Sequence, residues 1–368
     1  MLTRADDFPI HQTPEPVAYA GSDRNFYDRY FFNGYTRDGE HFFAAAMGIY
    51  PHLNLIDASF CVIRDGIQHN LHASRVLNFE RLDTVVGPIR IEIVEPLKQL
   101  RLLVDSPEHG LHADVMFHAR TSPIEEPRFV RRIGARTMMD YTRLTQNGSY
   151  EGSIGVDGRT VLLARESVRG TRDRSWGVRP IGVADPQPTL PMQLPQFYWL
   201  WAPLNFEEHA TFFHLNDDAE GRPWNTRGVL ASVGNGEPRD FADVAIEVKY
   251  RSGTRRVERA TLLYRDRGRE ALRVEVEPRF HFYMPGLGYM HPEWGHGIYR
   301  GDLAVGYDSY RAGEIDDGQP GMMHIQAFSR AGLELADGTR HDGCGVVEQL
   351  IIGPHAPSGF RELFDPAR

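Results

Sequence analysis

The residues that could do chemistry in this chain are acidic side chains and histidines distributed among aromatic segments. The 368 residues include 16 histidines and 50 acidic residues. Carboxylic acids and imidazoles are the usual proton donors and acceptors in enzymes. A carboxyl group that burial keeps protonated near neutral pH can protonate a C=C bond. The candidate acids and bases are Asp173, His214, Asp217, His296 and Asp302, with Asp308 and Glu348 as further alternatives.

Aromatic residues concentrate near the middle of the chain, where four of the five tryptophans occur within 49 residues. On a strand, Trp199 and Trp201 share one face and Tyr198 takes the other. Two interpretations stay open: an aromatic domain core, or the wall of a pocket for an apolar ligand. In a pocket, the ring faces would also stabilise a cation. The pocket interpretation assigns ligand binding to Trp176, Arg179, Tyr198, Trp199, Trp201, Trp224 and Trp294.

The segment Arg172–Pro180 combines three arginines, one carboxylate and a tryptophan in nine residues. One interpretation is a structural Asp–Arg pair that locks a corner beneath a tryptophan. The other is a corner at the mouth of a barrel that presents polar groups to a ligand. Nearby positive charge is expected to lower the pKa of Asp173. That expectation favours a role for Asp173 in orienting Arg179 or the backbone of the corner over a role as the acid.

Several histidine groups have the residue types of a metal site, but such a site needs three convergent ligands. No strand supplies a tight His-x-His pair, so we predict polar pocket or surface histidines, with no metal and no cofactor. A metal enzyme that uses His291 and His296, or His112 and His118, is the weaker alternative. The groups considered are His69 with His72, His109 with His112 and His118, and His291 with His296.

Composition and missing motifs exclude several classes of protein. The net charge of −9 and pI of about 6.0 argue against a nucleic-acid binder. The two cysteines, Cys61 and Cys344, exclude a disulfide framework. No glycine-rich nucleotide loop, serine-hydrolase elbow, His-Glu-x-x-His motif or calcium loop occurs. With no apolar run of about 18 residues and no signal-peptide core, we expect a cytoplasmic protein without a membrane segment, whose partner is a hydrophobic small molecule.

Short runs of β-branched and aromatic residues, separated by many of the 36 glycines and 24 prolines, predict an all-β fold. Turns are expected at Asp157-Gly158, Ser252-Gly253 and Asp337-Gly338. The best helical candidate is short, Ser74–Arg81. The predicted strands are Ile89–Val94, Leu100–Val104, Asp114–Ala119, Thr160–Ala164, Thr211–Leu215, Ala245–Tyr250, Ala260–Tyr264, Leu272–Glu277 and His324–Phe328.

A domain boundary is expected near Val183–Pro195, where the segment ADPQPTLPMQLPQ carries four prolines in thirteen residues. This boundary divides the chain into residues 1–185 and residues 186–368. Each part has a length that is ordinary for one domain, at roughly 100–200 residues. We predict one antiparallel β domain on each side of the boundary.

Two segments resemble a known group of proteins. The stretch YEGSIGVDGRTVLLARESVRGTRDRSWGVRP resembles the glycine-rich hairpin and Asp-x-x-Trp corner of the carotenoid 1,2-hydratase, AttH and tocopherol-cyclase-like families. The preceding VEPLKQLRLLVDSPEHGLHADVMFHA is similar to their upstream strands, so the resemblance covers roughly residues 85–230. It implies two consecutive lipocalin-like β-barrels and a hydrophobic, often isoprenoid, ligand. The corner of those families usually reads Asp-His-Glu-Trp, whereas this chain has Asp173-Arg174-Ser175-Trp176.

Together these observations predict a cofactor-independent enzyme that acts on a hydrophobic alkene, isoprenoid- or polyketide-like, by acid-initiated hydration or cyclisation. The alternative is a non-catalytic carrier of an apolar lipid or terpenoid, because lipocalin-like barrels also bind without turnover. A carboxylate or histidine inside the cavity without an arginine partner would favour the enzyme. A purely apolar lumen would favour the carrier.

Overall fold

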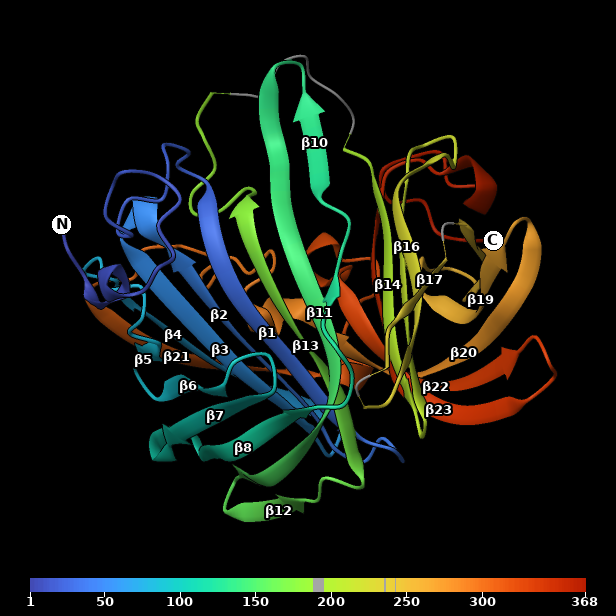
Figure 1. Ribbon diagram of the computed structural model, residues 1–368, viewed down its shortest axis with the longest axis horizontal. Coiled ribbons are helices and arrows are strands. Elements are labelled where there is room, and N and C mark those ends of the chain that lie inside the picture. The colour runs from blue at the N-terminus through green and yellow to red at the C-terminus, as the bar shows by residue number, and fades with distance from the viewer. Residues whose placement is uncertain (188–194, 235, 242) are drawn as a thin grey trace.

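The computed structural model describes residues 1–187, 195–234, 236–241 and 243–368. Two antiparallel sheets lie side by side, and every regular element apart from strands is a short 3-10 turn (Figure 1). The structure therefore confirms the all-β prediction, and its curled antiparallel sheets are consistent with lipocalin-like barrels. Among the described residues, no helix is long and apolar enough to cross a membrane.

The first sheet has 14 strands in the order β21-β4-β3-β2-β1-β13-β11-β8-β7-β6-β5, with β9, β10 and β12 also pairing with β11. Its strands are β1 (Phe26–Thr36), β2 (Phe42–Tyr50), β3 (Leu55–Arg64), β4 (Ile67–Val76), β5 (Val85–Val86), β6 (Ile89–Glu95), β7 (Gln99–Ser106), β8 (Leu111–Ala119), β9 (Ile124–Glu125), β10 (Phe129–Ile133), β11 (Arg136–Val156), β12 (Arg159–Leu163), β13 (Val168–Val178) and β21 (Leu303–Arg311).

The second sheet has nine strands in the order β17-β16-β15-β14-β23-β22-β20-β19-β18, and β16 contacts β18, so this sheet nearly closes into a barrel. Its strands are β14 (Phe197–Phe206), β15 (His209–Asp217), β16 (Pro223–Ser232), β17 (Arg239–Phe241), β18 (Asp243–Tyr250), β19 (Val257–Asp266), β20 (Arg269–Tyr283), β22 (Ile325–Leu335) and β23 (Arg340–Ile352). The 3-10 turns are η1 (Arg4–Asp7), η2 (Pro51–Leu53), η3 (Pro107–His109), η4 (Met284–Leu287), η5 (Ala312–Glu314), η6 (Pro320–Met322) and η7 (Ala356–Ser358).

The predicted strands and the three predicted turns between strands are confirmed. The predicted helix over Ser74–Arg81 is wrong, because residues 74–76 form the end of β4 and residues 77–81 form a loop. The β4 strand pairs with β3 on one side and β21 on the other. Two complete hydrogen-bond ladders outweigh the weak helical periodicity of so short a segment.

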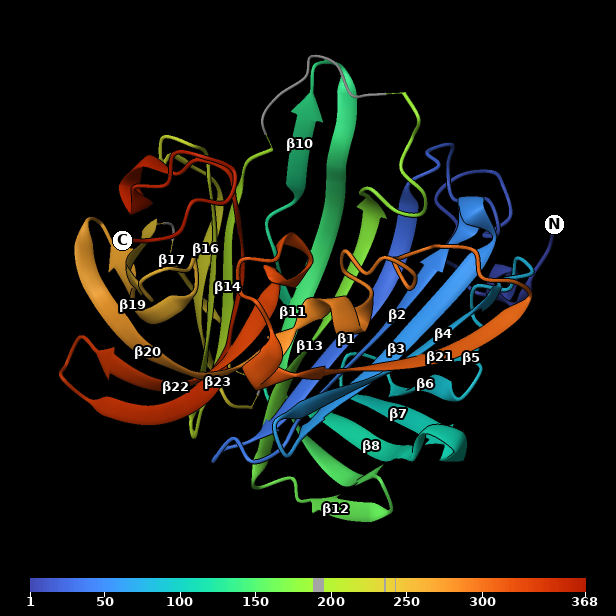
Figure 2. The same ribbon diagram turned by 180° about the vertical axis from the view of Figure 1, so that it is seen from behind.

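The connection between the two sheets falls in the predicted boundary region, between β13 and β14. Residues 188–194 of that region lie outside the described residues. The β21 strand follows the predicted boundary in sequence, yet it pairs with β4 of the first sheet. Figure 2 shows this chain segment leaving β20, crossing to the first sheet and returning to β22. The two-domain division stays a prediction.

Apolar side chains form one core inside each curled sheet and a third core between the sheets. In β1 the alternation of side chains divides Tyr30 and Phe32 from Phe31 and Tyr35. The first pair packs inside the first sheet, and the second pair packs against the second sheet. Because both faces of the central strands are buried, polar groups on the intersheet face lie in an apolar environment.

Candidate functional site

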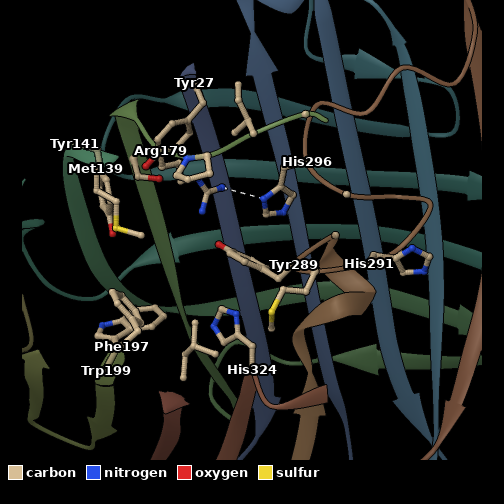
Figure 3. Close-up of a pocket in the computed structure, with 18 of the residues that line it drawn as sticks. Tyr27, Met139, Tyr141, Arg179, Phe197, Trp199, Tyr289, His291, His296 and His324 are labelled. Atoms are coloured by element: carbon tan, nitrogen blue, oxygen red, sulfur yellow. Dashed lines mark hydrogen bonds between the residues drawn. The ribbon is translucent and has the colours of Figure 1, made fainter. Parts of the chain in front are cut away.

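A pocket of about 390 Å³ opens where the two sheets meet, beneath the segment that connects β20 to β21 (Figure 3). This volume is within the range of about 300–1,000 Å³ that is usual for small-molecule sites. Its wall is largely aromatic, with a few polar groups. The lining residues that matter below are Tyr27, Tyr141, Arg143, Asp173, Arg179, Phe197, Trp199, Tyr289, His296 and His324.

Asp173 is the carboxyl group in the pocket wall. It lies in β13, with Phe31 of β1 and Thr145 of β11 as its direct neighbours across the sheet. Phe31 offers no donor, and the Thr145 hydroxyl donates to Glu126 instead. Among the described residues, Asp173 makes no side-chain hydrogen bond and no ion pair. Burial raises its pKa to about 7; Arg143 opposes this rise, and the negative charges of Glu126 and Glu348 add to it.

The expectation that neighbouring arginines lower the pKa of Asp173 is therefore wrong. Successive side chains of a strand point to opposite faces, so Arg172 and Arg174 point away from Asp173. Arg172 donates to Gln146 and packs on the Phe117 ring. Arg174 forms an ion pair with Asp28 and packs on the Tyr30 ring.

The expected corner at residues 172–178 is wrong as well. These residues belong to β13, which pairs with β1 and β11 along its whole length. Gly170 lies within the same strand, and close packing requires a glycine there, because a Cβ would lie 2.0 Å from the Asn33 carbonyl oxygen. Trp176 is 40% exposed and does not cover the site.

Behind the pocket wall lies a buried polar group that we call the Glu126 cluster: Glu126, Arg143, Thr145, Trp201 and His214. The Glu126 carboxylate accepts from Arg143 Nε (2.8 Å) and Nη2 (2.5 Å), from the Thr145 hydroxyl, and from Trp201 Nε1 (3.1 Å). His214 Nδ1 lies 3.3 Å from the same carboxylate. These partners overcome the cost of burial and lower the pKa of Glu126 to about 2.

The Glu126 cluster fixes Arg143 against the aromatic wall. The Arg143 guanidinium lies 5.4 Å from the Trp199 ring centroid and 5.5 Å from that of Trp201. One face of Trp199 is thus already occupied by a cation, whose charge Glu126 balances. Trp199 lines the pocket, whereas Trp201 is buried behind it and belongs to the cluster.

A histidine–glutamate pair lies next to Trp199 in the pocket wall. His324 Nε2 lies 2.6 Å from Glu348 Oε1, and Gln326 donates to Oε2 of the same carboxylate at 2.6 Å. A carboxylate only accepts hydrogen bonds, so Nε2 carries the imidazole hydrogen and Nδ1 is left as an acceptor. His324 packs edge-on against Tyr289 and Trp199. This pair has the arrangement of a general base oriented by a carboxylate.

Arg179 and His296 form the remaining polar pair of the wall, visible in the centre of Figure 3. His296 Nε2 lies 2.9 Å from the Leu287 carbonyl oxygen and must donate to it, so Nδ1 is an acceptor for Arg179 Nη2 at 3.1 Å. Burial and the charges of Arg29 and Arg179 hold the pKa of His296 well below its usual value. His296 is therefore a neutral group that orients Arg179.

The structure brings together four of the sequence-predicted residues in this pocket and places the others elsewhere. Those that line the pocket are Asp173, Arg179, Trp199 and His296. His214 and Trp201 belong to the Glu126 cluster. Asp302, Trp176 and Trp224 are exposed, Trp294 stacks on His72, and Asp217 and Tyr198 line a different cavity.

That second cavity, of about 460 Å³, lies at one end of the second sheet. Hydrogen bonds join most of its polar groups, although Asp217 Oδ1 is buried without a partner among the described residues. His355 lies between Asp217 (3.3 Å) and Ser358 (2.7 Å), and it stacks on Tyr198. The hydroxyls of Tyr198, Tyr250 and Ser358 continue this chain of hydrogen bonds. A local network of this kind, in which every side chain has a hydrogen-bond partner, is typical of a structural role.

His72, His291 and Asp308 have the residue types of a metal site and lie close together. However, His291 Nδ1 accepts backbone N–H groups from Glu293 (3.0 Å) and Trp294 (2.9 Å). The ring hydrogen must then be on Nε2, which donates to Asp308 at 2.7 Å. A metal-binding nitrogen cannot carry that hydrogen, so a hydrogen-bonded network explains this cluster better than a metal centre. His296 does not converge with it.

Sequence reasoning missed His324, Tyr289, Tyr27 and Tyr141 in the pocket wall. One usable signal was the alternation of His324 and Gln326 at the start of a predicted strand, which places both on one face. The register of β22 with β23 then sets Gln326 opposite Glu348. That pairing joins residues far apart in the chain, so no local pattern contains it.

The chain belongs to a family that is described as "Family of unknown function (DUF8625)", which matches residues 2–361. No curated protein was found to be related in sequence. Three solved structures share the fold at low identity. Kievitone hydratase from Nectria haematococca is 12% identical over 88% of both chains, with a TM-score of 0.51. An AttH-like protein from Nitrosomonas europaea is 11% identical over 93% of this chain and 98% of its own chain, with a TM-score of 0.52. CghA is 10% identical over 89% of this chain and 88% of its own chain, with a TM-score of 0.50. The AttH-like fold suggested by the sequence is thereby supported.

Proposed function

We propose that this protein is a cofactor-independent enzyme that adds a proton to a C=C bond of a hydrophobic substrate and directs the resulting cation to hydration or cyclisation. The observation that carries this proposal is Asp173, a carboxyl group in an aromatic pocket that has no hydrogen-bond donor and no cation within ion-pair distance among the described residues, and whose pKa burial raises despite the charge of Arg143. A protein of the same fold that is named a hydratase supports it. An isoprenoid-like substrate fits the aromatic wall.

The first step is proton transfer from the Asp173 carboxyl to one alkene carbon, which leaves a carbocation on the other carbon and a carboxylate on Asp173. A pKa of about 7 suits this task, because much of the group is protonated at neutral pH and its conjugate base is not too weak. The carbocation forms beside the free carboxylate and between the rings of Trp199 and Tyr289. Both stabilise positive charge as it develops.

The second step differs between the two outcomes. In hydration, a water molecule attacks the cation, and His324 Nδ1 accepts the proton that the water loses, while Glu348 stabilises the imidazolium. In cyclisation, a second double bond or oxygen of the substrate attacks instead, and the proton lost at the end returns to Asp173. Transfer of the proton from His324 to Asp173, directly or through water, restores the enzyme after hydration.

The contents of the pocket distinguish this proposal from a non-catalytic carrier. A carrier needs apolar area, and unpaired acidic groups in its lumen would weaken binding of a greasy ligand. This pocket instead contains a carboxyl that has no cation within ion-pair distance among the described residues, and a histidine oriented by a carboxylate. Catalysis explains why the protein keeps these two polar groups despite their cost in stability, whereas ligand binding by a carrier does not.

The test is incubation of the purified protein with a panel of isoprenoid alkenes in D₂O, with products analysed by mass spectrometry. Hydration adds the mass of water and places one deuterium on carbon, whereas cyclisation changes the structure without adding water. We expect D173N to lose roughly 10²–10⁴-fold in rate, which is the usual contribution of a general acid. The matched control is D302N, which changes an exposed aspartate and should retain full activity.

His324 gives a second readout. In H324Q the base is lost, so hydration should fall by a similar factor while any cyclised product persists. Deuterium incorporation that D173N leaves unchanged would contradict the proposal. So would the absence of any product from all alkenes that are shown to bind.

A further inference from the structure

The pocket contains two arginines whose charges are balanced in different ways. Arg143 is neutralised by Glu126, at 2.5 Å. Arg179 has no carboxylate within ion-pair distance among the described residues, although it lies in the wall of the same pocket. Its guanidinium lies over the rings of Tyr27 (4.4 Å) and Tyr289 (5.4 Å). An arginine always carries its charge. The Asp57 carboxylate acts on Arg179 only from beyond ion-pair distance and is itself paired with Arg29 at 3.9 Å, so no carboxylate of the described residues contacts this positive charge.

The hydrogen bonds of Arg179 also leave donors unused. Nη2 donates to His296 Nδ1, and that histidine is fixed as an acceptor by the Leu287 carbonyl. Nε is buried without a partner, and Nη1 has no hydrogen bond within 3.5 Å to the described residues, although the nearby Tyr289 hydroxyl also favours the charged guanidinium. A neutral histidine on one side and aromatic rings on two others orient the guanidinium without neutralising it. This is how a protein holds a cation ready for an external anion.

The chain also separates Arg179 from Asp173. Arg179 follows Asp173 by six residues, most of them in the extended strand β13. About 3.3 Å of rise per residue then places the two Cα atoms roughly 20 Å apart. No ion pair joins the two side chains, contrary to the expectation that Asp173 orients Arg179. A ligand that contacts both must have a head group and, several bonds away, a reactive hydrocarbon part.

We infer that Arg179 binds an acidic oxygen of the ligand, as a carboxylate, phenolate or enolate, and thereby orients an unsaturated hydrocarbon chain toward Asp173. This inference rests on the proposed function for its description of the chain, but the anion site stands on the geometry of Arg179 alone. The substrate class is therefore an amphipathic unsaturated acid, phenol or enol, and not a pure hydrocarbon such as a carotene. Arg179 acts in binding and orientation, and no proton or bond changes at it.

The experiment compares three ligands that share one ten-carbon isoprenoid chain: geranic acid, geraniol and methyl geranate. Their affinities are measured at pH 8, where the acid is ionised, by calorimetry and by quenching of tryptophan fluorescence. We expect geranate to bind at least tenfold more tightly than the ester and the alcohol, since hydrogen bonds to charged groups contribute that much. Equal affinities for the three ligands would overturn the inference without any mutation.

Variants assign the effect to Arg179. R179Q should abolish the preference for geranate and leave binding of the ester within about threefold, whereas R179K should retain part of the preference. The matched control is R128Q, which removes an exposed positive charge that pairs with Asp140 and should change nothing. A preference for geranate that persists in folded R179Q would also contradict the inference.

Two further arms separate the possible outcomes. In the first, the affinity of a prenylated 1,3-diketone, whose enol ionises, is compared with that of its enol methyl ether. If this ratio of affinities is larger than the ratio between geranate and its methyl ester, the site is assigned to an enolate. D173N should keep the full preference for geranate while it loses turnover. If turnover is absent and the preference remains, the proposed reaction fails and the anion site stands. If turnover depends on Asp173 and the preference for geranate is absent, the anion site fails and the proposed reaction stands.

Discussion

Glu126 and Asp173 are two acidic groups that experience the same arginine and have opposite pKa shifts. Glu126 accepts four hydrogen bonds in a closed cluster, and its pKa falls to about 2. Asp173 accepts none from the described side chains, and burial raises its pKa to about 7. Thr145 lies directly across the sheet from Asp173, yet its hydroxyl is committed to Glu126. Burial alone therefore does not mark a functional acid; a buried acid without donors, facing a pocket, does.

The same contrast separates the two cavities. At the end of the second sheet, His355 joins Asp217 to Ser358 by hydrogen bonds, and Asp217 Oδ1 alone among these three side chains is buried without a partner. In the pocket between the sheets, Asp173 and Arg179 have no oppositely charged partner within ion-pair distance among the described residues. A protein retains such groups at a cost in stability only where they serve another purpose. The comparison predicts that mutations at the satisfied groups damage folding and that mutations at the unsatisfied groups damage activity.

The largest effect on stability is expected at Glu126. In E126Q the Arg143 charge stays buried without its carboxylate, and breaking such a pair costs about 3–5 kcal/mol of unfolding free energy. Chemical denaturation measures this loss. D140N, which breaks the exposed pair with Arg128, is the control and should cost at most about 1 kcal/mol. Similar losses in the two variants would remove the structural role of the Glu126 cluster.

The next largest effect on stability is expected at Trp201, and the neighbouring Trp199 should behave differently. W201L loses a fully buried indole and the hydrogen bond to Glu126, so we expect a loss of about 2–3 kcal/mol. W199L removes part of a pocket wall, and its effect should appear mainly in turnover, because one ring face is available to a cation. Denaturation and kinetics of both variants check this. Equal losses of stability would place both residues in the core.

Stability should depend on pH through Asp173 in the direction opposite to that of an ordinary ion-paired acid. The folded-state pKa is raised above the unfolded value of 3.8 to about 7. Between these values the folded protein binds more protons than the unfolded chain, so stability from this group falls as pH rises from about 4 to 7. D173N should remove this dependence and raise the melting temperature at pH 8 by roughly 2–4 °C. A lower melting temperature of D173N at pH 8 would contradict the unpaired carboxylate.

The smallest effect is expected at Trp176. Trp176 is a candidate for a core or pocket residue because it lies in a segment with three arginines and a carboxylate. In the structure, however, its side chain is 40% exposed. W176A should therefore change the unfolding free energy by less than about 1 kcal/mol and leave ligand binding unchanged. Thermal unfolding and a binding titration in one variant suffice. A loss of 3 kcal/mol, or a clear loss of affinity, would mean that Trp176 is covered in solution.

The sequence predicted the strands well because alternation and turn residues are local signals, as in Asp157-Gly158 between β11 and β12. It does not place Asp173 correctly, because the local pattern predicts a corner in which neighbouring arginines converge on the carboxylate. In a strand these arginines point to the other face. The decisive neighbours, Phe31, Thr145 and Glu126, come from elements far apart in the chain, and only the register of the sheet brings them together.

The histidines illustrate the same limit. His296 and His214 were candidates because imidazole titrates near neutral pH. The Leu287 carbonyl and Arg179 fix His296 as a neutral group, and Glu126 engages His214 in the buried cluster. The histidine with a free acceptor in the pocket, His324, depends on Glu348, 24 residues away on the paired strand.

The protonation state of Asp173 is the central claim, and difference infrared titration measures it directly. The C=O stretch of a protonated carboxyl is recorded from pH 4 to 9 in the wild-type protein and in D173N, and the difference isolates the signal of Asp173. The account predicts one carboxyl band, absent from D173N, that disappears with a midpoint near pH 7. A midpoint below pH 5 would show that Asp173 is ionised at neutral pH and cannot be the acid that this account requires.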